Sequence, residues 1–198
     1  MEKNVFMTKQ PQIVFSGNNK VLVLLNEQQI VEQLGGMEAG SEAAADTPTA
    51  ERTAYQYDCY WLTLPSTAPH DAAAVLEAAK TSMLADITAY DSSTAVNSFL
   101  LNGMQVWLDK ATRVGLMNST TIAKSMGQKT TILWLGSYQL EVDCDKAIQL
   151  LSALEMYALE CFNVTAAHKK AVSSIESIED ILTYDYTAGY PEKLKMEV

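Results

Sequence analysis

The pattern that most constrains this fold is a tight turn between two short apolar runs, followed by a helix with an acidic cap, because it occurs twice. In the first copy, Asn102-Gly103 separates the apolar runs 98–101 and 104–108. Asn-Gly between apolar runs is the strongest short signal for a β-hairpin. Asp109 then caps a predicted helix over 110–125, because its carboxylate can accept backbone N–H groups of the first turn.

The second copy places Leu135-Gly136-Ser137 between the runs 130–134 and 138–142, which predicts a second hairpin. Asp143 then caps a long predicted helix over 144–172. The resulting order, ββα-ββα, predicts a compact α+β unit in the C-terminal half of the chain.

The N-terminal half shows the composition of antiparallel strands. The runs Gln12–Phe15 and Lys20–Leu25 flank a Ser-Gly-Asn-Asn turn, which predicts a hairpin. Residues 28–34 fit either a third strand or a short helical turn. Tyr55–Leu64 is rich in aromatic residues, which favours a strand.

Two further helices follow from local signals. Residues 69–89 are rich in alanine and carry a helical stripe of Val75, Leu76, Ala79, Met83 and Ile87. Ser66 or Thr67 can cap that helix. Ser173 and Glu176 have the spacing of a capping box, which predicts a short helix that ends near Leu182.

The predicted fold class is therefore α+β, with N-terminal antiparallel strands plus a helix, then a C-terminal ββα-ββα unit with a long helix. The expected divisions are an N-terminal β region over 1–64, a connecting helix over 65–96 and an α+β domain over 97–198. Residues 35–51 are rich in Gly, Ala, Thr and acids, so they are expected to form a mobile loop.

Charge and hydropathy narrow the classes of partner. The chain has 198 residues and a formal net charge of −10. A polyanion repels phosphate backbones and anionic lipid surfaces, so we expect neither nucleic acid nor a membrane as partner. The chain lacks an apolar run of the roughly 18 residues that a membrane helix needs. Since no apolar run follows the first residues as in a signal peptide, we expect a cytoplasmic protein.

Residues suited to catalysis or metal binding are few. Cys59, Cys144 and Cys161 lie in or beside apolar stretches, which predicts buried free thiols. The histidines are His70 and His168. His168 follows Cys161 by about 10 Å of helical rise, beyond the reach of a Cys-His dyad. A pair between His70 and Cys59 or Cys144 remains open. Metal-ligand spacings such as CxxC and HExxH are absent from the sequence, so we expect no metal and no cofactor.

The long predicted helix is apolar over most of its circumference, which is typical of a helix buried on several sides. Part of this surface can instead meet a second subunit, so a homo-oligomer is expected. The candidate interface residues are aromatic side chains of this helix and of the C-terminal tail, each considered a packing residue first: Tyr157, Phe162, Tyr184, Tyr186 and Tyr190.

Four blocks of the C-terminal half carry a resemblance to a known family. They are Asn102–Asp109 with 111–116, Leu133-Trp134-Leu135, Leu154–His168 and Tyr184–Leu194. Together they resemble the domain-of-unknown-function family numbered four-three-seven-six, over roughly Phe99 to Leu194 and more weakly over Tyr55–Thr63. Members of that family occur in tailed bacteriophages and prophages, notably of gut Bacteroidales, often near tail or tail-fibre genes. The family has no established catalytic residues.

The resemblance implies a non-enzymatic virion or tail-associated structural or adaptor protein that acts by protein–protein contacts. Its expected partners are other phage tail or virion proteins, and its expected location is the virion or the host bacterial cytoplasm. One alternative is a tail-fibre assembly chaperone, which is absent from the finished particle. Another alternative is a small phage enzyme, a hydrolase that uses the thiol of Cys59 or Cys144.

Overall fold

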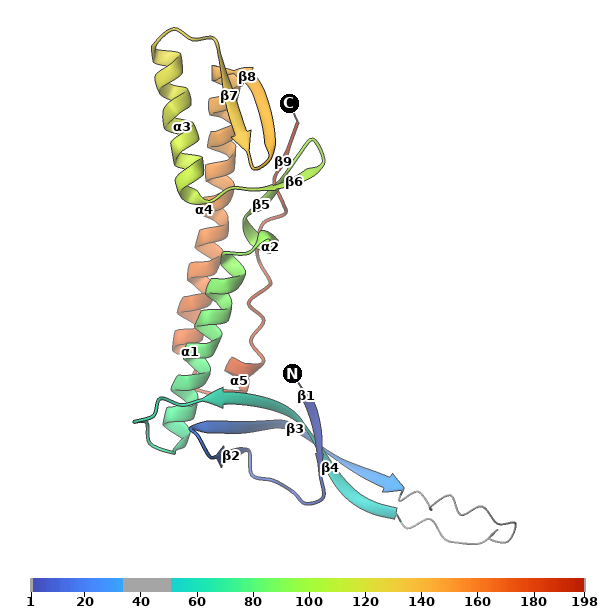
Figure 1. Ribbon diagram of the computed structural model, residues 1–198. Helices are drawn as coiled ribbons and strands as arrows, with labels where there is room; N and C mark the ends of the chain where they lie inside the picture. Colours follow the sequence, from blue (N-terminus) through green and yellow to red (C-terminus); the bar gives the residue numbers. More distant parts are fainter. Residues whose placement is uncertain (1, 34–50, 198) are drawn as a thin grey trace, which may run out of the picture. The chain divides into compact units, whose positions relative to one another are not determined.

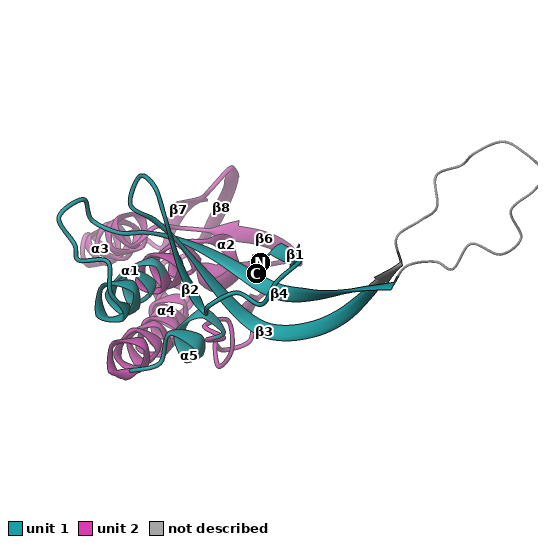
Figure 2. Ribbon diagram, turned by 90° about the horizontal axis from the view of Figure 1, so that it is seen from below, with its two compact units in different colours: residues 1–82, 176–183 teal, residues 83–175, 184–198 magenta. Residues whose placement is uncertain are grey.

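The computed structural model describes residues 2–33 and 51–197, and these residues mix helices with antiparallel sheets (Figure 1). The predicted α+β fold class is confirmed. The chain divides into two compact units, coloured separately in Figure 2. Unit 1 comprises residues 1–82 and 176–183, and unit 2 comprises residues 83–175 and 184–198.

The sheet of unit 1 has the strand order β1-β4-β3-β2, with every neighbouring pair antiparallel. The strands are β1 (Glu2–Phe6), β2 (Ile13–Ser16), β3 (Lys20–Gln33) and β4 (Glu51–Thr63). The predicted hairpin is confirmed as β2 and β3, joined through Asn18 and Asn19, both with positive φ. Asparagine tolerates this left-handed conformation better than most residues, which explains the Asn-Asn turn.

Residues 28–34, for which a strand and a helical turn were both open, continue β3 as far as Gln33. The pairing with β4 shifts register between Leu25 and Gln28, where Asn26 adopts a φ of 53°. The side chain of Asn26 donates to Asp58 Oδ2 at 2.8 Å and fixes this irregularity. The mobile loop predicted for 35–51 lies outside the described residues, apart from Glu51, which instead begins β4.

Unit 1 buries side chains on both faces of its central strands. On one face Leu22, Leu24, Tyr57 and Cys59 form a cluster. On the alternate face of β3, Val21 and Val23 are fully buried. A strand buried on both faces reads as a continuous apolar run, as Lys20–Leu25 does.

Helix α1 (Ala72–Asp91) begins later than predicted, and its cap is neither Ser66 nor Thr67. The backbone N–H of Ala74 donates to Asp71 Oδ1 at 2.8 Å. A carboxylate at the helix N-terminus accepts this bond and also faces the positive end of the helix dipole. The predicted apolar stripe is confirmed at its four buried positions: Val75, Ala79, Met83 and Ile87.

Unit 2 has the predicted ββα-ββα order. Its elements after α1 are α2 (Thr94–Asn97), β5 (Ser98–Leu101), β6 (Met104–Trp107), α3 (Lys110–Ser125), β7 (Thr130–Leu135), β8 (Tyr138–Asp143), α4 (Cys144–Ser174) and β9 (Lys195–Met196). Asp109 and Asp143 cap α3 and α4 as predicted. Helices α3 and α4 lie side by side, and α4 also packs against β7 and β8 (Figure 1).

The two hairpin turns use different residues with positive φ. Asn102 and Gly103 both have positive φ between β5 and β6, as a type I′ turn requires. Between β7 and β8, Gly136 alone has positive φ, at 68°, which fits the first central position of a type II′ turn.

The predicted capping box at Ser173 and Glu176 is wrong. Ser173 lies inside α4, and its hydroxyl donates to Lys169 O at 2.9 Å. The short helix α5 (Ile178–Leu182) is capped instead by Ser177, whose side chain accepts from Asp180 N. Helix α4 runs to Ser174, past its predicted end at Val172, so Ser173 is not available as a cap for the next helix.

The core of unit 2 lies among α4, the two hairpins and the C-terminal strand β9, which pairs parallel with β5. Its buried members are Val96, Phe99, Leu101, Val106, Leu108, Leu133, Leu135, Val142, Ala147, Leu151, Leu154, Tyr157, Cys161 and Met196. All three cysteines are free and buried, as predicted. Among the described residues, no helix is both long enough and apolar enough to cross a membrane.

Candidate functional site

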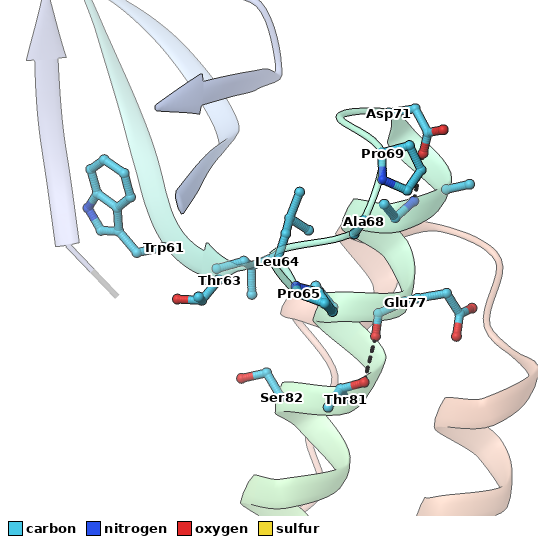
Figure 3. Close-up of a pocket in the computed structure, with 14 residues that line it drawn as sticks. Trp61, Thr63, Leu64, Pro65, Ala68, Pro69, Asp71, Glu77, Thr81 and Ser82 are labelled. Atoms are coloured by element: carbon cyan, nitrogen blue, oxygen red, sulfur yellow. Dashed lines mark hydrogen bonds between the residues drawn. The ribbon is translucent and has the colours of Figure 1, made fainter. Parts of the chain in front are cut away.

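A groove of about 690 Å³ in unit 1 is the main candidate for a binding site. It lies where β4 ends and α1 begins (Figure 3). Small and apolar side chains dominate its lining: Trp61, Leu62, Leu64, Pro65, Ala68, Pro69, Ala73, Ala74 and Ala78.

The local sequence explains why the groove is open. Leu64 is buried, and its N–H donates to Asn19 O at 2.8 Å, which anchors the end of β4. Ala68 N then donates to Pro65 O at 2.9 Å, which turns the chain toward the cap of α1. The alanines of α1 that line the groove have no side chain beyond Cβ, so the space beside the helix stays open.

The charged side chains among the described lining residues are both acids, Asp71 and Glu77. Asp71 caps α1 through one carboxylate oxygen. Glu77 is exposed, and its carboxylate lies 3.4 Å from Lys80 Nζ. The Lys80 side chain is largely buried and that of Glu77 is 72% exposed, so solvent screens this pair on the Glu77 side and weakens it. The groove therefore suits an apolar segment that carries a Lys or Arg side chain.

Sequence reasoning did not predict this groove, although its signals were present. The alanine-rich segment 69–89 predicts a helix, but this local signal does not indicate which face of the helix borders the end of β4. Trp61, at the β4 end of the groove, is 52% exposed. An exposed tryptophan followed by two prolines and an alanine-rich helix face is the pattern that could have indicated it.

A second groove, of about 470 Å³, lies in unit 2 and includes one predicted interface residue, Phe162. Phe162 is 62% exposed, and Trp107 and Leu159 line the same groove with exposed side chains. In its lining, Arg113 is buried, and its Nε donates to Glu155 Oε1 at 2.8 Å. Arg113 also donates to Leu108 O at 2.8 Å, which fixes the start of α3 against α4.

The structure places the other predicted interface residues in internal contacts. Tyr157 is buried, and its hydroxyl donates to Val96 O at 2.7 Å. Tyr186 and Tyr190 both pack edge-on against Tyr90, each with ring centroids 5.6 Å apart. The hydroxyl of Tyr184 bonds His168 Nδ1 at 2.8 Å. These contacts fit the packing role that was expected first, while an interface role of the half-buried tail tyrosines stays a prediction.

The thiols and imidazoles have contacts of their own. Burial raises the pKa of the Cys59 thiol and of the Cys161 thiol, which disfavours the nucleophilic thiolate. His70 stacks on Phe15 with ring centroids 5.2 Å apart. His168 bonds the tail through both ring nitrogens, including one bond to Ala188 O. The described residues hold no group of three or more His, Cys, Asp or Glu side chains suited to a metal ion.

The substitution Tyr157→Phe is expected to lower the free energy of unfolding by about 1 kcal/mol at neutral pH, because it removes the buried hydrogen bond to Val96. Burial raises the pKa of the Tyr157 hydroxyl. In the unfolded chain this hydroxyl ionises at the ordinary tyrosine pKa of about 10, before it ionises in the folded protein. The contribution of the Tyr157 hydroxyl to stability is therefore complete below that pH and is lost as pH rises above it. Urea unfolding of both proteins at pH 7 and above pH 10 should show the difference shrinking. A constant difference would contradict this assignment.

No family model, curated protein or solved structure matches this chain in comparisons with known proteins. The family resemblance described above therefore stays a prediction.

Proposed function

We propose that this protein is a non-enzymatic structural or adaptor protein of a bacteriophage tail or virion, and that it acts by protein–protein contacts. The observation that carries the binding role is the groove of unit 1, with its alanine-lined helix face and its exposed Trp61. The phage setting rests on the resemblance of the C-terminal half to the domain-of-unknown-function family.

The occupant that best fits the groove is a short apolar segment of another virion protein with a Lys or Arg beside it. The lining is mostly apolar, which favours burial of aliphatic or aromatic side chains. Its charged members are Asp71 and Glu77, so a cationic side chain finds complementary charge at the groove. A copy of this chain is a poorer occupant of this groove, because the acids Asp71 and Glu77 of the lining would face a chain of net charge −10.

The analysis of purified phage particles tests directly whether the protein is a component of the virion. We expect peptides of this protein in the particle, in a fixed ratio to the tail proteins, when particles are analysed by quantitative mass spectrometry. Absence from finished particles, with tail fibres failing to assemble when the protein is removed, would instead indicate the assembly chaperone. Absence from particles, with normal assembly in its absence, would contradict both roles.

The substitution Ala78→Phe tests the groove, because the larger side chain fills it from α1. We expect about tenfold fewer copies per particle, as is typical when the centre of an interface is blocked. Ala85→Phe is the matched control, since Ala85 is exposed on the same helix and does not line the groove. Equal incorporation of both variants, at unchanged melting temperature, would contradict the groove as the contact site.

A further inference from the structure

The hairpin of β7 and β8 has outer edges that pair with no other strand of the described residues. These two strands form a sheet by themselves, with Ile132 opposite Glu141 and Trp134 opposite Gln139. Next to the hairpin, Cys144 N donates to Lys129 O at 2.8 Å. Lys129 therefore belongs to a hydrogen-bonded pair. Because bonded and non-bonded pairs alternate along an antiparallel ladder, the odd-numbered residues of β7 form the backbone hydrogen bonds to β8, and the even-numbered residues do not.

The backbone N–H and C=O groups of Ile132 and Trp134 therefore point away from β8, toward the edge of β7 that pairs with no other described strand. The side chains of the same two residues lie on the outer face of the hairpin, where Ile132 is 50% and Trp134 is 57% exposed. The alternate side chains, Leu133 and Leu135, are buried in the core of unit 2. One strand thus presents both unpaired backbone groups and exposed apolar side chains.

The residues of β7 differ from those of an edge strand that is protected against pairing with another chain. Soluble proteins place Lys, other charges or proline on exposed edge strands to prevent pairing with another chain. The sequence of β7, Thr-Thr-Ile-Leu-Trp-Leu, contains none of these. By contrast, β8 carries Glu141 and Asp143. The two edges of one hairpin therefore differ, and β7 is the one suited to pairing.

We propose that β7 pairs antiparallel with β7 of a second copy of this chain, so that Ile132 of each copy lies opposite Trp134 of the other. In this register the outward backbone groups of Ile132 and Trp134 bond each other across the two-fold axis. Since directly opposite residues of an antiparallel pair point to the same face, each exposed isoleucine packs against an exposed tryptophan. The product is a continuous four-stranded sheet, β8-β7-β7-β8.

The second copy is the occupant that charge and pattern favour. In the proposed register each β7 strand offers the same residues to its copy, so the strand matches itself. Because β7 carries no charged residue, a contact confined to it brings no like charges directly opposite each other, although each chain has a net charge of −10. Pairing through β8 would instead bring Glu141 and Asp143 close to their own copies. This contact uses unit 2 and leaves the groove of unit 1 untouched, so the two proposals can fail separately.

Sedimentation equilibrium of the full chain from about 1 μM to about 1 mM tests the pairing, a range suited to a small interface. We expect a dimer at the upper end. Ile132→Pro removes an outward N–H without removing a hairpin bond, and it should weaken association about tenfold or more. Glu141→Pro is the matched control, because its N–H points outward from the other edge of the same hairpin.

Retention of the dimer by Glu141→Pro and its loss in Ile132→Pro, with both circular dichroism spectra unchanged, is the expected result. A monomer at every concentration, or equal association of the two variants, would overturn the proposal. A chain with Trp61→Phe and Trp107→Phe keeps Trp134 as its one tryptophan. Its fluorescence should shift to the blue as concentration rises, and a spectrum independent of concentration would also overturn the β7 contact.

Discussion

Phe99→Ala is expected to lower the free energy of unfolding by about 3–5 kcal/mol, as replacing a buried aromatic ring by alanine does in other cores. Phe99 is 1% exposed and belongs to the core cluster of unit 2. The substitution removes the ring and leaves a cavity between β5 and its neighbours. Because domains of this size are stable by only about 5–15 kcal/mol, this loss is a large part of the total free energy of unfolding.

Phe162→Ala is the matched control for this experiment, since it removes the same ring from a side chain that is 62% exposed. We expect it to change the free energy of unfolding by less than about 1 kcal/mol. Urea denaturation followed by circular dichroism measures both. Similar losses in the two variants would contradict the burial of Phe99 in the core of unit 2.

Arg113→Met is expected to cost about 2–3 kcal/mol. Arg113 is a buried cation, and its replacement leaves both the Glu155 carboxylate and the Leu108 carbonyl without their donor. Breaking a fully buried pair costs more, but the Glu155 side chain is 36% exposed, so water offsets part of the loss. The free energy of unfolding in urea at neutral pH gives the value.

Two variants separate the charge from the geometry. Glu155→Gln keeps an oxygen that can accept from Arg113 Nε, so we expect only about 1 kcal/mol of loss. Arg113→Lys keeps the charge but cannot reach Glu155 and Leu108 at once, so it should fall between Glu155→Gln and Arg113→Met. A lysine variant as stable as the original chain would show that the two-way contact contributes little.

The C-terminal elements could be predicted because their signals are local. Asn102-Gly103 sets a turn, and Asp109 and Asp143 each cap a helix within a few residues of the signal. What the sequence missed depends on distant partners. Strand β1 forms by pairing with β4, and β9 has two residues that pair with β5, so neither shows a pattern of its own.

The candidate site was harder to predict than the fold for the same reason. The groove of unit 1 exists because β4 ends beside the alanine face of α1, and no single segment contains it. The sequence predicts an interface role for both Phe162 and Tyr157, but Phe162 is strongly exposed and Tyr157 on the same helix is buried. Both lie on a helix that is apolar over most of its circumference, so the sequence alone could not separate its inner from its outer side.

Unit 1 is discontinuous, since residues 176–183 belong with residues 1–82. A ribosome releases the strands of this unit first and α5, with its buried Ile181, only after nearly all of unit 2. At ordinary elongation rates the delay is roughly ten seconds. The sheet is complete in this interval, but unit 1 lacks α5, so the apolar surface that Ile181 covers in the folded unit stays open to wrong contacts while the intervening polypeptide emerges.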